Sequence, residues 1–172
     1  MFRGYALNLH LVQLEQHIIK HDLQISDINQ RIDNIVQTAI PPKAGLFFKG
    51  ETFDAYVFVA DLIRSAKEDI KLVDNYIDDS VLLLLGKRQS EVSATIYTER
   101  ITNQIQTDLS RYNTQYPPIA IQEMEKVHDR FLIIDRQLYH FGTSFKDLGK
   151  RLFVVSRIEE PAVTDALMKV FS

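Results

Sequence analysis

The stretch HDRFLIID at residues 128–135 decides the fold, and GTS follows it at residues 142–144. The apolar block at 131–134 is rich in strand formers, so it predicts an interior strand. His128 and Arg130 stand just before this block, two residues apart, and in an extended chain they project from the same side. An imidazole can attack phosphorus or carry a proton, and a guanidinium can bind two phosphate oxygens. The stretch therefore predicts phosphate chemistry at the start of a buried strand.

The residues after this strand extend the prediction. Gly142 begins a tight segment after a second expected strand at 137–141, and its backbone amide can serve phosphate together with the hydroxyls of Thr143 and Ser144. Lys146 adds a positive charge nearby. Each residue also has a plainer interpretation: His128 as a surface residue, Asp135 as a strand end that bonds to a turn, and Gly142 as a turn glycine.

The pattern His-x-basic-x4-Asp-x6-Gly resembles the signature of the phospholipase D superfamily, with Thr143 at the position of its serine. The resemblance implies an α/β fold with a mixed sheet flanked by helices. It also implies a phosphohistidine mechanism without metal or cofactor, in which two such motifs meet at a twofold axis. One histidine attacks phosphorus and its twin protonates the leaving group. Because this chain has one motif, a homodimer is expected, with these roles: catalysis by His128, Arg130 and Asp135; phosphate binding by Arg130, Gly142, Thr143, Ser144 and Lys146.

Three positions depart from the superfamily pattern. Arg130 replaces a lysine, Phe145 stands where many members have asparagine, and Lys150 and Arg151 occupy a place where an acidic residue is frequent. The segments 71–79, 112–118 and 141–156 also look like the C-terminal region of bacterial proteins that begin with a phage-type DNA-binding module. Residues 2–8 resemble the end of such a module. The chain would then be a fragment. Two functions follow: a phosphodiesterase, best matched to a nuclease, or an inactive phosphate-binding and dimerisation module that regulates an attached DNA-binding domain.

Composition indicates a compact domain with an appendage. The chain has 172 residues, is 45% hydrophobic and contains no cysteine, and no apolar run approaches the ~20 residues of a membrane span. The absence of a basic and then apolar start argues against a secretory signal, so a cytoplasmic protein is expected. The net charge of -3 argues against indiscriminate polyanion binding. The motif region, residues 126–151, is nevertheless basic, which suits a local phosphate site.

Residues 7–39 carry a heptad seam. Apolar residues recur at alternating steps of four and three, with His21 at one position, over more than four repeats. Such a stripe needs a partner helix, so we expect residues 1–40 to form a coiled-coil dimerisation helix that ends before Pro41-Pro42. A helix folded back on its own domain is the alternative, and the heptads alone also permit a trimer. The seam comprises Leu7, Leu11, Leu14, Ile18, His21, Ile25, Ile28, Ile32, Ile35 and Ala39.

Strand and helix patterns alternate from residue 43 to residue 172. This alternation indicates an α/β domain with a largely parallel or mixed sheet. Strands are expected over 46–48, 70–73, 92–97, 119–124, 131–134, 137–141 and 152–155, and helices over 53–66, 81–85, 101–112 and 161–171.

The sequence DNYIDD, residues 74–79, directly follows one expected strand. Ligands gather at the carboxyl ends of strands in open α/β sheets, so Asp74 or Tyr76 could border the phosphate site. Three carboxylates are also compatible with Mg²⁺ or Ca²⁺. The commoner arrangement is that Asp79 or Ser80 caps the next helix, and we expect no metal here.

Overall fold

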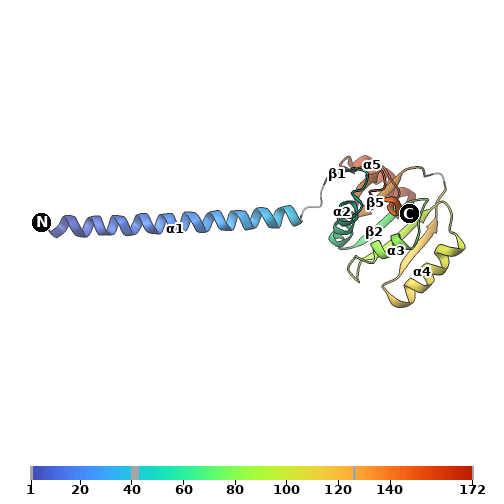
Figure 1. The fold of residues 1–172 in the computed structure, drawn as a ribbon, viewed down its shortest axis with the longest axis horizontal. Coiled ribbons are helices and arrows are strands. Elements are labelled where there is room, and N and C mark those ends of the chain that lie inside the picture. The colour runs from blue at the N-terminus through green and yellow to red at the C-terminus, as the bar shows by residue number, and fades with distance from the viewer. Residues whose placement is uncertain (1, 40–42, 126, 172) are drawn as a thin grey trace. The chain divides into compact units, whose positions relative to one another are not determined.

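The computed structural model describes residues 2–39, 43–125 and 127–171. Within the first helix, side chains are described for residues 11–31 only. The chain divides into two compact units, Met1–Pro41 and Pro42–Ser172 (Figure 1).

The first unit is one long helix, α1, Phe2–Ala39. Its described apolar seam side chains are half or more exposed. A partner helix would cover exposed apolar surface of this kind. The pairing of α1 into a coiled coil stays a prediction. The structure describes no side chain for four seam residues, Leu7, Ile32, Ile35 and Ala39. The expected break at Pro41-Pro42 lies outside the described residues.

The second unit is built on one seven-stranded mixed sheet, in the order β1-β7-β6-β5-β2-β3-β4. β2, β3 and β4 are parallel to one another, and every other pairing is antiparallel. The expected mixed sheet is therefore confirmed, with strand boundaries shifted by at most three residues. The strands are β1 Ala44–Phe47, β2 Asp69–Val73, β3 Ser93–Thr98, β4 Ile119–Glu123, β5 Arg130–Ile134, β6 Gln137–Phe141 and β7 Phe153–Ile158.

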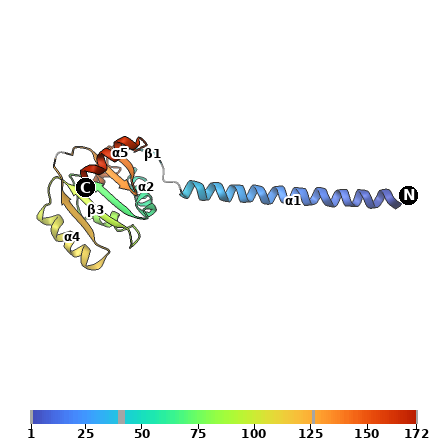
Figure 2. The same cartoon turned by 180° about the vertical axis from the view of Figure 1, so that it is seen from behind.

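Helices cover both faces of this sheet. On one face α2, Thr52–Ser65, packs on α3, Asp79–Leu85, which packs on α4, Asn103–Gln115; Figures 1 and 2 show these helices beside the strands. Their buried apolar side chains share one core with alternate strand residues. The other face is partly covered by the C-terminal segment, α5 Pro161–Met168 and the 3₁₀ turn η2 Lys169–Phe171. The Phe171 ring lies 4.6 Å from that of Tyr97, which points away from the shared core.

Several chain segments meet at one end of the sheet. β2 ends where β5 begins, since Val73 pairs with Phe131, and β6 ends beside the same point, since Phe141 pairs with Arg130. We call this end of the sheet the site edge. It brings together three segments that are far apart in sequence: the loop after β2 (74–78), the loop before β5 (124–129) and the loop between β6 and β7 (142–152).

Candidate phosphate-binding site

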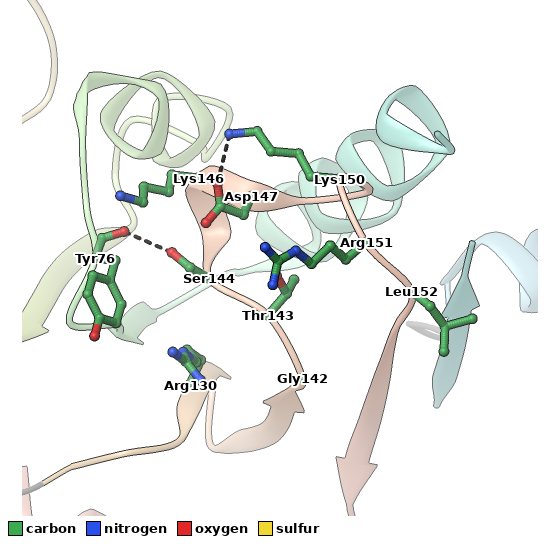
Figure 3. A pocket seen from close by; sticks show the side chains of 10 residues that line it. All are labelled: Tyr76, Arg130, Gly142, Thr143, Ser144, Lys146, Asp147, Lys150, Arg151 and Leu152. Carbon is green, nitrogen blue, oxygen red and sulfur yellow. Dashed lines mark hydrogen bonds and ion pairs between the residues drawn. The ribbon is translucent and has the colours of Figure 1, made fainter. Parts of the chain in front are cut away.

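A pocket of about 450 Å³ opens at the site edge. It contains four cationic side chains, one carboxylate, the hydroxyl side chains of Thr143, Ser144 and Tyr76, and the backbone at a glycine (Figure 3). The cationic side chains and the Thr143 hydroxyl can donate to phosphate oxygens. The Gly142 amide, expected from the sequence to bind phosphate, instead donates to the Val154 carbonyl at 3.0 Å, and the Ser144 hydroxyl donates to Asp74 at 2.7 Å. The lining residues are Tyr76, Arg130, Gly142, Thr143, Ser144, Lys146, Asp147, Lys150, Arg151 and Leu152.

The pocket keeps an excess of positive charge. Lys150 Nζ lies 2.7 Å from Asp147 Oδ1. This hydrogen bond lowers the pKa of Asp147, with further help from the charges of Lys146 and Arg151. In the part of the chain that the structure describes, no ion pair engages Arg130, Lys146 or Arg151. Three cations therefore remain available to an anionic ligand.

Tyr76 gathers two of these cations. The Arg130 guanidinium carbon lies 5.8 Å from the centroid of the Tyr76 ring, and Lys146 Nζ lies 5.6 Å from it. Both separations are in the range of cation–π attraction, worth about 0.5–1 kcal/mol at an exposed site. The ring itself is more than half exposed. It borders the pocket, as the sequence suggested, and holds cations from β5 and from the β6–β7 loop near each other.

Asp74 lies beneath the pocket and is fully buried. Its Oδ2 accepts hydrogen bonds from Ser144 Oγ at 2.7 Å and from the Phe145 amide at 2.8 Å, and its Oδ1 accepts from the Tyr76 amide at 3.0 Å. Burial raises the pKa of Asp74, against these hydrogen bonds and the charge of Arg130, which favour ionisation. Asp74 therefore supports the site from below and is not one of the pocket's lining residues.

The β6–β7 loop is pinned at two points. Phe145 is buried, and its ring lies 4.5 Å from that of Phe141, so the residue at the superfamily's asparagine position belongs to the core. Gly149 has φ +70°, and a Cβ there would stand 2.4 Å from Thr52 Cα, so only glycine fits. The Gly149 carbonyl accepts a 2.9 Å hydrogen bond from the Gly50 amide. These contacts fold the loop back so that Lys150 and Arg151 line the pocket.

His128 sits at the same edge but outside the pocket lining. It is exposed in the loop before β5, two residues ahead of Arg130. The carbonyl of its neighbour Val127 accepts a 2.6 Å hydrogen bond from Asn75 Nδ2. The carboxylate of Asp129 lies 3.6 Å from His140 Nε2, so this acidic group is oriented toward β6.

Asp135 lies at the opposite end of β5. A five-residue strand separates it from Arg130 by roughly 16 Å along the chain. Its carboxylate accepts hydrogen bonds from three successive backbone amides, those of Lys67, Glu68 and Asp69, at 2.8 to 3.0 Å. Partial burial opposes ionisation, but these hydrogen bonds hold the pKa of Asp135 below its ordinary value. The structure thus does not bring Asp135 together with the other site residues, and its contacts match the alternative of a strand end bonded to a turn.

The structure brings the expected phosphate-binding residues together in one pocket. Of the expected phosphate-binding residues, Arg130, Gly142, Thr143, Ser144 and Lys146 all line it. Asp147, Lys150, Arg151 and Leu152 were not assigned to the site, although the basic count of residues 126–151 pointed to this region. Lys126 lies outside the described residues.

Two carboxylates after β2, those of Asp74 and Asp78, accept hydrogen bonds from groups of the chain itself. The cap of α3 is Asp78, one residue before the expected Asp79, and its carboxylate accepts from the Ser80 amide at 3.1 Å. Across residues 2–39, 43–125 and 127–171 the structure shows no group of three or more His, Asp or Glu side chains that could hold a metal ion. Nor does any helix in these ranges have the length and apolar character to cross a membrane.

Comparison with solved structures identifies the fold. The chain resembles NucT from Helicobacter pylori with a TM-score of 0.55 and 14% identity, covering 74% of this chain and 91% of that one. It resembles polyphosphate kinase from Porphyromonas gingivalis with a TM-score of 0.55 and 14% identity, over 74% and 23% of the two chains. It also resembles phosphatidylserine synthase from Haemophilus influenzae with a TM-score of 0.52 and 14% identity, covering 72% of this chain and 35% of that one. No family model and no curated protein sequence matches the chain. All three structures have one superfamily in common.

Proposed function

We propose that this chain, whose α/β unit has the phospholipase D fold, is a phosphodiesterase that acts on nucleic acid as a homodimer. In this proposal the reaction proceeds through a phosphohistidine and needs no metal. The three similar structures handle phosphate esters or anhydrides, but at 14% identity they support the fold and not the reaction. The proposal therefore rests on the residues at the site edge.

The observation that carries the proposal is the cationic pocket at the site edge, the same end of the sheet as the motif histidine. Arg130, Lys146 and Arg151 face a space lined by the hydroxyls of Thr143 and Ser144, and His128 precedes Arg130 by two residues. A bound phosphodiester would have its oxygens neutralised by the guanidinium and ammonium groups. Charge that develops on those oxygens in the transition state would be stabilised in the same way.

The proposed chemistry needs two imidazoles. A nitrogen of a neutral His128 attacks phosphorus, the bond from phosphorus to the leaving oxygen breaks, and protonated His128 of the second copy gives its proton to that oxygen. Water then attacks the phosphohistidine, with the second imidazole taking the proton, and His128 is released. One chain supplies one motif, so the second copy completes the site.

Two exposed apolar surfaces support assembly into a dimer. The first is the described part of the α1 seam, residues 11–31. The second is a patch on β1 and β7, where Leu46 and Val154 are cross-strand partners and both are half exposed. Leu152 belongs to this patch and also lines the pocket. A second copy seated on the patch would therefore lie next to the phosphate-binding groups.

Nucleic acid is the proposed substrate class for two reasons. The chain covers 91% of the nuclease NucT but only 35% and 23% of the two other enzymes. The pocket is also polar and cationic, and the three cations that remain available there suit a chain of phosphates.

A second function is favoured by one specific observation. His128 is exposed and does not line the pocket, whereas the phosphate-binding groups are assembled. The alternative is a module that binds phosphate, dimerises and so regulates an attached DNA-binding domain. Such a module needs the pocket but does not need the histidine. It predicts phosphate binding with no turnover.

Hydrolysis of bis(4-nitrophenyl) phosphate and of a single-stranded oligonucleotide in EDTA tests the proposal. The wild-type protein should cleave both substrates, and His128→Ala and Arg130→Ala should each lose most of the rate. Lys87→Ala is the matched cation control, because Lys87 is exposed beyond the C-terminal end of α3, away from the site edge. Cleavage that survives His128→Ala, or that is absent from a wild-type protein that binds phosphate, contradicts the proposed enzyme; the second result supports the regulatory module.

A further inference from the structure

The loop after β2 makes hydrogen bonds to both halves of the candidate site. Asp74 contacts the β6–β7 loop through Ser144 and Phe145, as described above. Asn75, the next residue, contacts the loop before β5 on the other side, because its Nδ2 donates to the Val127 carbonyl at 2.6 Å. Both residues follow a strand whose backbone ladder continues to the Asp74 amide, which donates to the Tyr97 carbonyl at 3.0 Å. Two adjacent side chains thus connect rigid sheet to two separate loops.

Asn75 makes a contact that requires a side-chain amide. Its Oδ1 accepts from the Glu99 amide at 3.0 Å, on the segment after β3, while its Nδ2 donates to Val127. A carboxylate could serve the first contact but would place an oxygen against the Val127 carbonyl oxygen. Among the described residues of the loop before β5, the Met124 amide donates to the Thr98 carbonyl, Asp129 Oδ1 lies 3.6 Å from His140 Nε2, and Glu125 and His128 are exposed. Asn75 therefore connects the loop after β2 to Val127, the residue directly before His128.

We infer that Asp74 and Asn75 are positioning residues. Asp74 holds the phosphate-binding loop, and Asn75 holds His128 beside that loop. The inference rests on the proposed function for the role of His128, and it adds the residues that set the geometry between histidine and phosphate. Catalytic groups must be placed to within a fraction of an ångström by residues around them. An exposed histidine on a loop has no such support from its own side chain, so the support must come from the backbone beside it.

Asn75→Asp is the test variant, and the chain supplies a matched control. Asn113 bridges two segments with the same chemistry: its Nδ2 donates to the Ile119 carbonyl at 3.0 Å, and its Oδ1 accepts from the Ile119 amide at 2.9 Å. Asn113 is in α4, and its contact lies at the start of β4, away from the site edge. Asn113→Asp therefore reproduces the loss of one donor and the gain of one charge without touching the loops of the site.

The decisive readout is the NMR response of the His128 ring to inorganic phosphate, with the ring signals identified by their loss in His128→Gln. In the wild-type protein and in Asn113→Asp, phosphate binding should shift the ring signals. Asn75→Asp should bind phosphate with affinity within about twofold of wild type but lose the ring response, since Asp74 still holds the binding loop. Asp74→Asn should instead weaken phosphate binding by roughly tenfold, because an amide cannot accept from all three of its donors.

Activity provides a separate second readout. If the wild-type protein cleaves phosphodiesters, Asn75→Asp should lower kcat by roughly tenfold to a hundredfold with little change in KM. If it cleaves none, the proposed function fails, and the phosphate and ring measurements still decide the inference because they need no turnover. A wild-type His128 ring that ignores phosphate overturns the inference. So does an Asn75→Asp protein with a wild-type ring response, or an equal loss of response in Asn113→Asp.

Discussion

Replacing Asp135 should destabilise the fold and leave phosphate binding intact. Its carboxylate accepts from three backbone amides at the end of the sheet away from the pocket. Asp135 and Arg136 also form the two-residue turn between β5 and β6, with φ values of 47° and 72°. Aspartate and asparagine adopt this left-handed conformation more readily than other residues with a Cβ. Asp135→Asn therefore keeps the turn and removes the charge, whereas Asp135→Ala removes both supports.

The size of the effect follows from the number of contacts. A hydrogen bond to a charged group contributes about 1.5–3 kcal/mol, with the lower end suited to amides that water can reach. In Asp135→Asn the side-chain oxygen can still accept from Glu68 and Asp69, but the new amide group faces the Lys67 N–H, so a loss of about 1–2 kcal/mol is expected. Asp135→Ala loses all three bonds, at about 1.5 kcal/mol each, and adds about 1 kcal/mol of backbone strain, for a total of about 5–6 kcal/mol.

Chemical denaturation as a function of pH is the assay. The pKa of Asp135 is lowered in the folded state, so its stabilisation is present above the ordinary value of 3.8 and is lost as the pH falls through the folded-state pKa. The gap in unfolding free energy between wild type and Asp135→Asn should thus be full at neutral pH and shrink below pH 3.8. If Asp135→Asn has wild-type stability and fails to bind phosphate, the carboxylate acts at the site and this reasoning is wrong.

Three further results are expected. Arg130→Ala should weaken sulfate or phosphate binding by roughly tenfold in a calorimetric titration, with little change in thermal stability, whereas unchanged affinity would remove the arginine from the site. Gly149→Ala should cost about 2–3 kcal/mol in thermal unfolding and also weaken anion binding, since a Cβ would collide with Thr52; a neutral substitution would contradict the pinned loop. Ile18→Lys combined with Ile25→Lys should shift sedimentation from dimer toward monomer, and an unchanged dimer would show that the helical seam is not the interface.

Local sequence patterns were sufficient for the architecture. The apolar block 131–134 forms β5, and the helical spacing of 53–66 forms α2, because in both cases burial and backbone propensity indicate the same element. Strand and helix boundaries shifted by only a few residues. The mixed direction of the sheet depended on which strands pair across the chain, and the sequence left it open between largely parallel and mixed.

The site was predictable only where the motif is local. Arg130 begins β5 and residues 142–144 directly follow β6, so the pairing of β5 with β6 brings them together. Asp135 belongs to the same motif but is at the other end of its strand, a separation that motif spacing does not express. Arg151 reaches the pocket because the loop folds against the start of α2, about a hundred residues earlier in the chain.

Asn75 shows a second limit of sequence reasoning. It is one polar residue within a polar segment, and its bond to Val127 spans 52 positions. The one signal available was its place directly after a buried strand, where the sequence analysis considered Asp74 and Tyr76 as border residues.

Trapping of the covalent intermediate tests the central claim most directly. The protein would be mixed with an excess of oligonucleotide in EDTA and quenched at alkaline pH, where a phosphoramidate bond to histidine survives. Peptide mass mapping would then locate the adduct. The account predicts a nucleotidyl adduct on the peptide that contains His128, absent from His128→Ala, and reduced in Asn75→Asp. Cleavage of the oligonucleotide without any adduct on His128, or an adduct on another residue, would contradict the phosphohistidine mechanism proposed for this site.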